Sequence, residues 1–257
     1  MSPALILTYH AVESGPPPLC VAPGLFREHV DVLADSGAQS VTVAGLADRL
    51  RSGASPDGLF AITFDDGFAS VVREAVPLLA DRGLTATVFC VAGHLGRTND
   101  WSTQPARTPR RALATSGELA ALAAEGFEIG SHGTEHVPLH SASKDVLERE
   151  LLESKELIGG AVGQPVTSLA YPYGVEPQPI GRELVKRSFS AACTGQMNMI
   201  RSADDPLALP RIDAHYLRRP ELLRRALGGS LGPYLGLRRL GARARRVLRE
   251  DYVERPA

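Results

Sequence analysis

Short apolar runs rich in β-branched residues alternate with amphipathic helical segments along most of the 257-residue chain. This alternation favours a parallel α/β arrangement, and about seven such units favour a closed or nearly closed barrel over an open sheet. We therefore predict a distorted (β/α) barrel of about seven strands. The expected strands span residues 4–9, 39–43, 59–64, 85–91, 127–130, 166–170, 190–193 and 207–212, and the expected helices span 25–36, 46–50, 71–81, 144–158 and 181–187, with one more between a capping Ser116 and a terminating Gly126.

The strand expected at residues 59–64 ends abruptly at two adjacent carboxylates, Asp65 and Asp66, and a glycine. Side chains alternate along a strand, so one carboxylate can bind a metal ion while the other faces a substrate. Two further ligands, His132 and His136, follow a later expected strand and are four residues apart. A carboxylate pair that merely caps a loop would not need these histidines, so the pattern favours a metal site.

The stretch 63–67 and the pair His132 and His136 together resemble the motifs of the polysaccharide deacetylase family. These metal-dependent esterases and amidases share the NodB homology domain and form carbohydrate esterase family four. The resemblance implies a NodB-type barrel and a divalent metal ion held by Asp66, His132 and His136. Two imidazoles and one carboxylate suit zinc, although other first-row ions could substitute. Asp65 would then be the general base that takes a proton from water.

A histidine just past the strand expected at 4–9, His10, lies where active-site groups gather in a barrel. The chain resembles the exopolysaccharide-modifying subgroup of the family, in which a Tyr-His pair stands near the N-terminus and the motif order is circularly permuted. That resemblance implies that His10 is the general acid that protonates the departing amine, and a surface or capping role is the alternative. It also implies that the backbone N–H of Tyr173 stabilises the oxyanion.

Many family members carry an arginine just before a Pro-Tyr pair, where it orients the catalytic aspartate, and this chain lacks it there. We suggest that Arg211 approaches Asp65 from another strand exit. With the same logic, Asp213 is a candidate for positioning His10.

Substrate contacts are expected on one long segment and one strand exit. Residues 96–111 show neither helical nor strand periodicity, and we interpret them as a substrate-side loop. Trp101 in this loop either offers a flat apolar face to a sugar ring or anchors the loop to the barrel. Tyr171 and Pro172 follow the strand expected at 166–170 and are further candidates for substrate binding.

Other polar residues are expected outside the site or at its margin. His29 lies on a helix among charged neighbours and should face solvent. His94 could line the same opening of the barrel as the candidate ligands. His140 would be redundant as a metal ligand, because Asp66 already completes the set. The helix expected at 144–158 has leucines on one side and Glu and Lys on the other, so we expect it to be structural.

The net charge of −1 and 44% hydrophobic content suggest neither nucleic-acid binding nor disorder. Three scattered cysteines are too few for a disulfide framework and indicate a reducing compartment. The N-terminus lacks the basic segment and long apolar core of a secretory signal. We therefore expect a protein without a nucleic-acid partner, located in the cytoplasm, either free or peripheral at the inner membrane face.

We predict a catalytic barrel over residues 1–216 and an Arg-rich amphipathic helical tail over 217–257. The stretch 217–249 contains ten arginines, Glu221 as its one acid, and leucines spaced to form an apolar stripe. Such a helix can lie at an anionic membrane surface. Alternatively, it packs against the barrel with its arginines in water.

The leading hypothesis for function is hydrolysis of N-acetyl groups on amino sugars of a polysaccharide or of a lipid-linked glycan. A second hypothesis keeps the chemistry but changes the substrate to a small amide, formyl or O-acetyl compound. A third is a catalytically silent carbohydrate-binding domain with the same fold.

Overall fold

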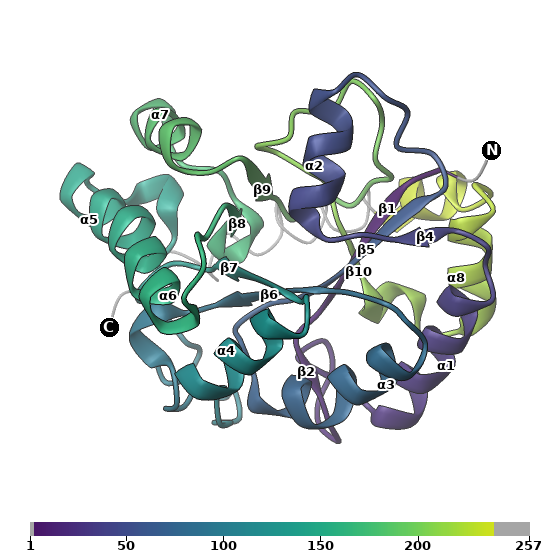
Figure 1. The fold of residues 1–257 in the computed structure, drawn as a ribbon, viewed down its shortest axis with the longest axis horizontal. Coiled ribbons are helices and arrows are strands. Elements are labelled where there is room, and N and C mark those ends of the chain that lie inside the picture. Colours follow the sequence, from purple (N-terminus) through teal and green to yellow (C-terminus); the bar gives the residue numbers. More distant parts are fainter. Residues whose placement is uncertain (1–2, 239–257) are drawn as a thin grey trace.

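A curved sheet of parallel strands runs through the centre of the computed structural model, which describes residues 3–238 (Figure 1). Its strands are β1 (Leu5–Tyr9), β4 (Gln39–Ser40), β5 (Leu59–Phe64), β6 (Thr87–Cys90), β7 (Glu128–Ser131), β8 (Ser168–Ala170), β9 (Ala191–Cys193) and β10 (Ile212–Asp213), and a separate small sheet pairs β2 (Ala11–Val12) with β3 (Cys20–Val21). The eight-stranded sheet has the order β10-β1-β5-β6-β7-β8-β9, and β4 pairs with the first half of β5. Helices surround the sheet (Figure 1), which confirms the predicted distorted (β/α) barrel.

The helices agree with the predicted ones in place, with shifts at their ends. They are α1 (Pro23–Ala34), α2 (Val43–Arg51), α3 (Val76–Asp81), α4 (Ser116–Ala124), α5 (Lys144–Glu148), α6 (Ser154–Val162), α7 (Pro179–Ser188) and α8 (Pro220–Leu227). A π-helical turn, Arg149–Glu153, joins α5 to α6, and another, Val71–Ala75, precedes α3. The predicted cap of α4 is wrong by one residue, because Thr115 forms a capping box with Glu118.

Strands β9 and β1, near opposite edges of the sheet, are connected by residues 209–213, which nearly close the barrel. Leu209 forms a parallel bridge with Cys193 of β9, and three residues later Ile212 of β10 pairs with Leu7 of β1. The strand predicted at 207–212 is therefore shorter than expected, since the chain crosses there from one edge of the sheet to the other. This crossing brings the residues just before β10 into the barrel.

Alternation along the strands directs one face of the sheet into the barrel interior. Ala61 of β5 lies in a buried cluster with Ile6 of β1 and Phe89 of β6, and α2 packs on the same cluster through Val43 and Leu46. The first turn of α2 donates backbone hydrogen bonds to side chains at the starts of β6 and β7. Helix α2 therefore closes the amino end of the barrel. The last residues of each strand lie at the opposite, carboxyl end.

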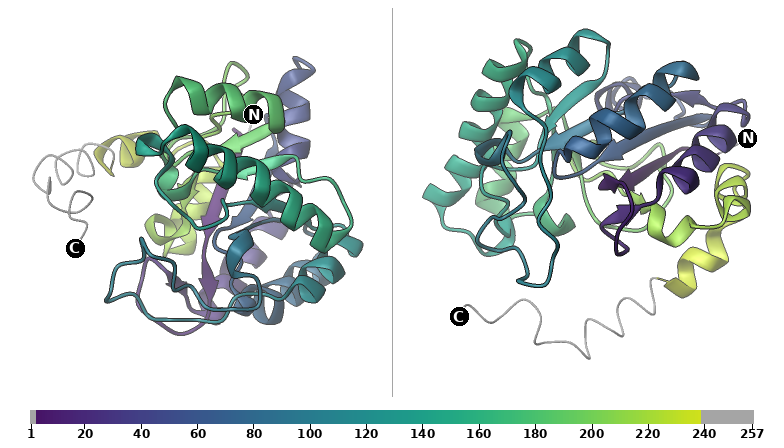
Figure 2. Two further views of the ribbon diagram at one scale, coloured as in Figure 1. Left: turned by 90° about the vertical axis from the view of Figure 1, so that its left-hand side faces the viewer. Right: turned by 90° about the horizontal axis from the view of Figure 1, so that it is seen from below.

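The described part of the predicted tail packs against the barrel beside α1 (Figure 2). Five of its leucines are buried, namely Leu217, Leu223, Leu227, Leu231 and Leu235, whereas Leu222 is partly buried and Leu237 is 72% exposed. Its arginines are exposed, namely Arg218, Arg219, Arg224, Arg225 and Arg238. Over residues 217–238 the apolar stripe thus faces the protein, as the second interpretation of this segment expected, and residues 239–257 lie outside the described residues. None of the described helices has both the length and the apolar character that crossing a membrane requires.

Candidate metal-dependent active site

The side chains expected to act together lie at the carboxyl end of the barrel. His10 follows β1, Asp65 and Asp66 follow β5, and His132 follows β7. The backbone N–H of Asp65 donates to the carbonyl oxygen of Tyr9 at 2.9 Å, which extends the β1–β5 pairing by one residue. Because parallel strands end at one rim, residues from three distant segments meet there.

Asp66, His132 and His136 form a compact, buried cluster of candidate metal ligands. Asp66 Oδ1 lies 3.6 Å from Nε2 of each histidine, and the two Nε2 atoms are 3.2 Å apart. One ligand atom from each residue falls within 4.8 Å of the others. Burial, followed by the charge of His132, lowers the pKa of His136 well below its usual value, which favours the neutral imidazole that binds metals. The donor set fits a divalent ion.

The ring of His132 is oriented by a backbone carbonyl. Its Nδ1 lies 2.8 Å from the carbonyl oxygen of Ala170 at the end of β8. A carbonyl oxygen can only accept, so Nδ1 carries the proton and Nε2 is left with a free lone pair. This arrangement is typical of metal-ligating histidines.

Backbone strain is concentrated in the same place. Among the described residues other than glycine, positive φ angles occur at Asp66 (69°), His136 (53°) and Tyr173 (60°). Such conformations are uncommon for residues with a Cβ and persist only where the surrounding structure holds them. All three residues belong to the predicted site.

Arg211 meets Asp65 inside the barrel, as the sequence hypothesis expected. Its Nη1 and Nη2 donate to the two carboxylate oxygens at 2.7 and 2.8 Å, and its Nε donates to the carbonyl oxygen of Thr194 at 3.2 Å. Burial by itself would raise the pKa of Asp65, but Arg211, His132 and His10 together hold it well below its usual range. Asp65 is therefore ionised, and its Oδ2 lies 3.9 Å from Nε2 of His132.

His10 interacts electrostatically with both carboxylates. Burial raises the pKa of Asp66, and the charges of His10 and His132 offset part of that rise. The Nδ1 atom of His10 is buried without a hydrogen-bond partner. The expected contact from Asp213 is therefore not made through Nδ1, and Asp213 Oδ1 instead accepts the backbone N–H of His215 at 2.7 Å.

A family model described as polysaccharide deacetylase matches residues 52–189, more than half of the chain. The chain belongs to the polysaccharide deacetylase family. The members of this family are metal-dependent hydrolases, and the Asp-His-His cluster of this chain is a candidate metal site.

Individual relatives agree with the family in sequence or in fold. The Bacillus subtilis (strain 168) protein YxkH is 28% identical over 170 residues, which are 66% of this chain and 56% of YxkH. This chain thus spans just over half the length of that relative. The Streptococcus pyogenes deacetylase PplD has a TM-score of 0.74 at 22% identity, covering 90% of this chain and 99% of PplD. IcaB from Ammonifex degensii has a TM-score of 0.72 at 22% identity, covering 90% and 97% of the two chains. At this identity the two structures show a common fold.

The aromatic residues around the Asp-His-His cluster of this deacetylase family member differ in exposure. Trp101 is only 3% exposed and its ring centroid lies 4.7 Å from that of His136. Tyr173, 46% exposed, packs on His136 at the same distance, and its hydroxyl donates to Thr103 Oγ1 at 2.8 Å. Thr103 Oγ1 in turn donates to the carbonyl oxygen of His136 at 2.9 Å. Trp101 therefore anchors its loop, and the idea that it offers an open face to a sugar is wrong.

The prediction of Tyr171 as a substrate contact is wrong, while that of Pro172 stays a prediction. Tyr171 is fully buried and its hydroxyl donates to the carbonyl oxygen of Leu207 at 2.8 Å, while Pro172 is buried beside it. The prediction that His29 faces solvent fails too, because the side chain is 1% exposed and its Nδ1 lies 2.9 Å from the hydroxyl of Tyr9. The polar atoms of Tyr171 and His29 each have a partner far away in sequence, so local pattern could not reveal their burial.

His94 and His140 lie outside the metal cluster. His94 Nε2 is 3.0 Å from a carboxylate oxygen of Glu135, and its ring packs edge-on against Trp101 at 5.7 Å. His94 is thus buried behind Trp101, and the idea that it lines the mouth is wrong. His140 has no part in the cluster, as expected.

Sequence reasoning missed Glu150, a buried residue of the helix that was expected to be purely structural. Its side chain is 0% exposed and accepts backbone hydrogen bonds from Thr134 and Glu135, between the two histidine ligands. A signal was present, since Glu150 lies three residues after Leu147 and one before Leu151, both in the apolar stripe.

Proposed function

We propose that this deacetylase family member hydrolyses N-acetyl groups on amino sugars of a polysaccharide or of a lipid-linked glycan. The observation that carries the proposal is the position of Asp65, a buried carboxylate ionised by Arg211 and 3.9 Å from a candidate metal ligand. An ionised base beside a metal site is what hydrolysis of an unactivated amide requires. Such a pair would have no purpose in a silent carbohydrate-binding domain.

Asp66, His132 and His136 would hold the metal ion. Two imidazole nitrogens and one carboxylate suit zinc and leave coordination positions open, as catalytic sites do. When bound, the ion supplies Lewis acidity to the acyl carbonyl and lowers the pKa of a water molecule.

The remaining steps belong to side chains and backbone of the chain. Asp65 accepts the proton of the attacking water, and Arg211 keeps the carboxylate fixed and charged. His10 donates a proton to the departing nitrogen, because an amine leaves far more readily than its anion. The backbone N–H of Tyr173 is the proposed donor to the oxyanion, and the left-handed conformation of this residue sets the direction of that N–H group.

Acetate release from chito-oligosaccharides tests the proposal. The zinc-loaded wild type should release acetate, and Asp65→Asn should retain zinc while losing at least ~100-fold in kcat, since general-base catalysis contributes about 10²–10⁴-fold. Equal loss of zinc and activity in Asp65→Asn would contradict the base assignment. A wild type that cleaves only O-acetyl or formyl substrates would contradict the amino-sugar proposal and leave the metal site standing.

We also propose that the protein works at the cytoplasmic face of a membrane when its glycan is lipid-linked. The supporting feature is the row of exposed arginines on residues 218–238, each worth about 1 kcal/mol near an anionic surface. Deleting residues 217–257 would remove leucines that belong to the hydrophobic core, so the sharper variant replaces Arg218, Arg219, Arg224 and Arg225 with Gln. Cosedimentation with phosphatidylglycerol vesicles should fall in this variant, and equal sedimentation of both proteins would rule out the arginines.

A further inference from the structure

The loop that carries both histidine ligands depends on backbone hydrogen bonds from outside the loop. Between His132 and His136 the chain adopts left-handed conformations at Gly133 (φ 85°) and at His136 itself. These conformations prevent a continuous helix or strand, so the N–H groups of Thr134 and Glu135 have no local backbone acceptor. Since this loop is buried, other groups must satisfy them.

Glu150 supplies that acceptor from the π-helical turn Arg149–Glu153. The N–H of Thr134 donates to Oε2 at 3.0 Å, and the N–H of Glu135 donates to Oε1 at 3.0 Å and Oε2 at 3.1 Å. No salt bridge joins Glu150 to a basic residue in the part of the chain that the structure describes. The carboxylate thus serves the loop backbone alone. Burial raises its pKa, and the N–H groups of Glu135, Thr134 and Val137 offset part of that rise.

Further contacts tie the same helical turn to the loop. Thr134 Oγ1 donates to the carbonyl oxygen of Arg149 at 2.9 Å. Ser154 Oγ donates to the carbonyl oxygen of Glu150 at 2.5 Å and lies 2.7 Å from Ser131 Oγ. Ser131 Oγ accepts the N–H of Gly133 at 3.2 Å. Residues 131–135 are therefore held by one short stretch of helix.

The space around the carboxylate shows that the contact is tight. A Cβ atom added at Gly133 would lie 2.5 Å from Glu150 Oε2. The loop backbone and the carboxylate can approach this closely only because residue 133 has no side chain.

We propose that Glu150 is a positioning residue for the metal site. By accepting the N–H groups of Thr134 and Glu135, it fixes the backbone between the two ligands and thereby the 3.2 Å separation of their Nε2 atoms. The inference rests on the proposed metal-dependent function. Groups that orient ligands indirectly typically contribute 10–100-fold to metal affinity.

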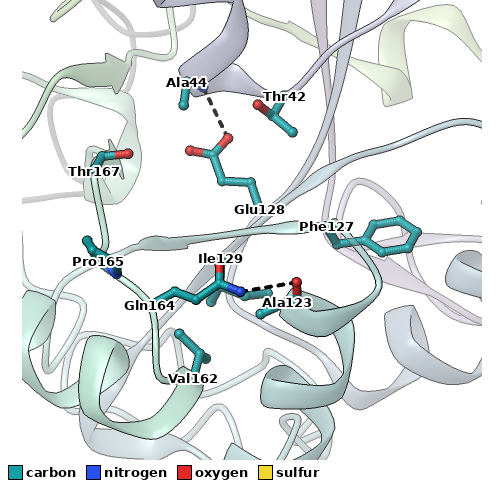
Figure 3. A pocket seen from close by; sticks show the side chains of 11 residues that line it. Thr42, Ala44, Ala123, Phe127, Glu128, Ile129, Val162, Gln164, Pro165 and Thr167 are labelled. Carbon is teal, nitrogen blue, oxygen red and sulfur yellow. Dashed lines mark hydrogen bonds between the residues drawn. The ribbon is translucent and has the colours of Figure 1, made fainter.

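Glu128 provides a matched control at the other end of the same strand, β7. Its carboxylate accepts hydrogen bonds from the backbone N–H of Ala44 and from the hydroxyls of Thr87 and Ser168. Figure 3 shows it beside a pocket lined by Thr42, Gln164 and Thr167, at the amino end of the barrel. Loss of either carboxylate removes a hydrogen bond from a backbone N–H group, but of the two only Glu150 reaches the ligand loop.

The test is zinc affinity, measured by chelator competition for the wild type, Glu150→Gln, Glu150→Asp and Glu128→Gln. The Kd for zinc should rise about 10–100-fold in Glu150→Gln, less in Glu150→Asp, which keeps the charge, and not at all in Glu128→Gln. Unchanged zinc affinity in Glu150→Gln would overturn this inference alone. A wild type that binds no zinc would overturn the proposed function as well.

Hydrogen exchange of the wild-type protein is a second test that needs no variant. The amide protons of Thr134 and Glu135 should exchange with deuterium as slowly as those of the central strands β5 and β6, because a buried carboxylate holds them. Rapid exchange of both amides would overturn the inference even if the Glu150 variants fail to fold.

Discussion

Carboxylates lie at both ends of the barrel, but Glu128 is only partly buried whereas Asp66 is buried, and their hydrogen-bond partners differ. At the amino end, Glu128 accepts the N–H of Ala44 at 3.1 Å and the hydroxyl of Thr87 at 2.7 Å. At the carboxyl end, no side-chain hydrogen bond is made by Asp66 among the described residues, and the Nε2 atoms of His132 and His136 lie 3.6 Å from its Oδ1. The first carboxylate is satisfied by the protein, whereas the second has free lone pairs that a cation would fill.

Two neighbouring carboxylates at the carboxyl end show that the donors around a buried carboxylate, rather than its burial, indicate its role. Asp65 and Asp66 are neighbours and equally buried, yet the first is neutralised by the guanidinium of Arg211 and the second is left to the imidazoles. Buried charges must be paired or bind a metal. The carboxyl end therefore contains one paired carboxylate, the proposed general base, and one unpaired carboxylate, the proposed metal ligand.

Removing the unpaired carboxylate should have the largest effect. Asp66→Asn keeps the shape but loses the charge, and we expect the Kd for zinc to rise by more than about 100-fold, since a direct ligand contributes more than an outer-shell group. Isothermal titration with zinc measures the change. A Kd within tenfold of the wild-type value would mean that Asp66 is not a ligand.

Removing the partner of the paired carboxylate should mainly reduce stability. Arg211→Met leaves Asp65 buried without a counter-charge, which should lower the free energy of unfolding of the metal-free protein by about 3–5 kcal/mol at pH 7. The wild-type pKa of Asp65 is below that of the unfolded chain, so the stability from this pair is present above about pH 4 and is lost as pH falls below it. The difference between variant and wild type should therefore shrink towards pH 3.

Urea unfolding at pH 7 and pH 3 measures this, with Arg82→Met as the control. Arg82 pairs with Asp31 on the surface, where both side chains are about two-fifths exposed, so its loss should cost less than about 1 kcal/mol. A cost for Arg211→Met as small as that of the control would show that Asp65 has another partner.

A buried histidine of helix α1, His29, lies outside the candidate metal-ligand cluster and sharpens the comparison. Burial lowers the pKa of His29 to about 4, partly offset by the carbonyl of Leu217, while an unfolded histidine has a pKa near ~6.5. Between these values the unfolded chain binds more protons, so stability falls as pH decreases from 6.5 to 4. At pH 5 the loss should be about 2 kcal/mol, from ~1.36 kcal/mol per pKa unit.

His29→Gln should remove this part of the pH dependence. Urea unfolding of both proteins at pH 7.5 and 5 isolates it, because all other groups titrate in both. If the wild type and the variant lose the same stability on acidification, His29 is not the group responsible.

The fold and the central site were predictable because both follow from one rule. Parallel strands end at one rim, so Asp65, Asp66 and His132 had to converge once their strands were recognised. Arg211 could be predicted because no arginine stands just before the Pro-Tyr pair, where many family members have one. The structure shows how Arg211 comes to lie in the barrel, since β10 pairs directly with β1. Its exact partner atoms follow from the crossing between β9 and β10.

The remaining residues could not be predicted because their partners are distant in sequence. Tyr171 is buried because its hydroxyl reaches Leu207, and Glu150 because its carboxylate meets Thr134 and Glu135. Helical periodicity predicted that the acidic residues of 144–158 face water. Glu150 is buried instead, because tertiary contacts with the loop amides determine its position. Polar residues within an apolar stripe are where such periodicity is least reliable.

The smallest effect should come from the satisfied carboxylate at the amino end. Glu128→Gln keeps one acceptor oxygen but turns an amide group towards the donors Thr87 and Ser168, and it removes a negative charge from the first turn of α2. We expect the free energy of unfolding to fall by about 1–2 kcal/mol, with kcat and zinc affinity unchanged. Urea unfolding and acetate release on the same preparation check both. If zinc affinity fell as far as in Asp66→Asn, the two ends of the barrel would be coupled, and hydrogen-bond donors around a carboxylate would not suffice to tell its role.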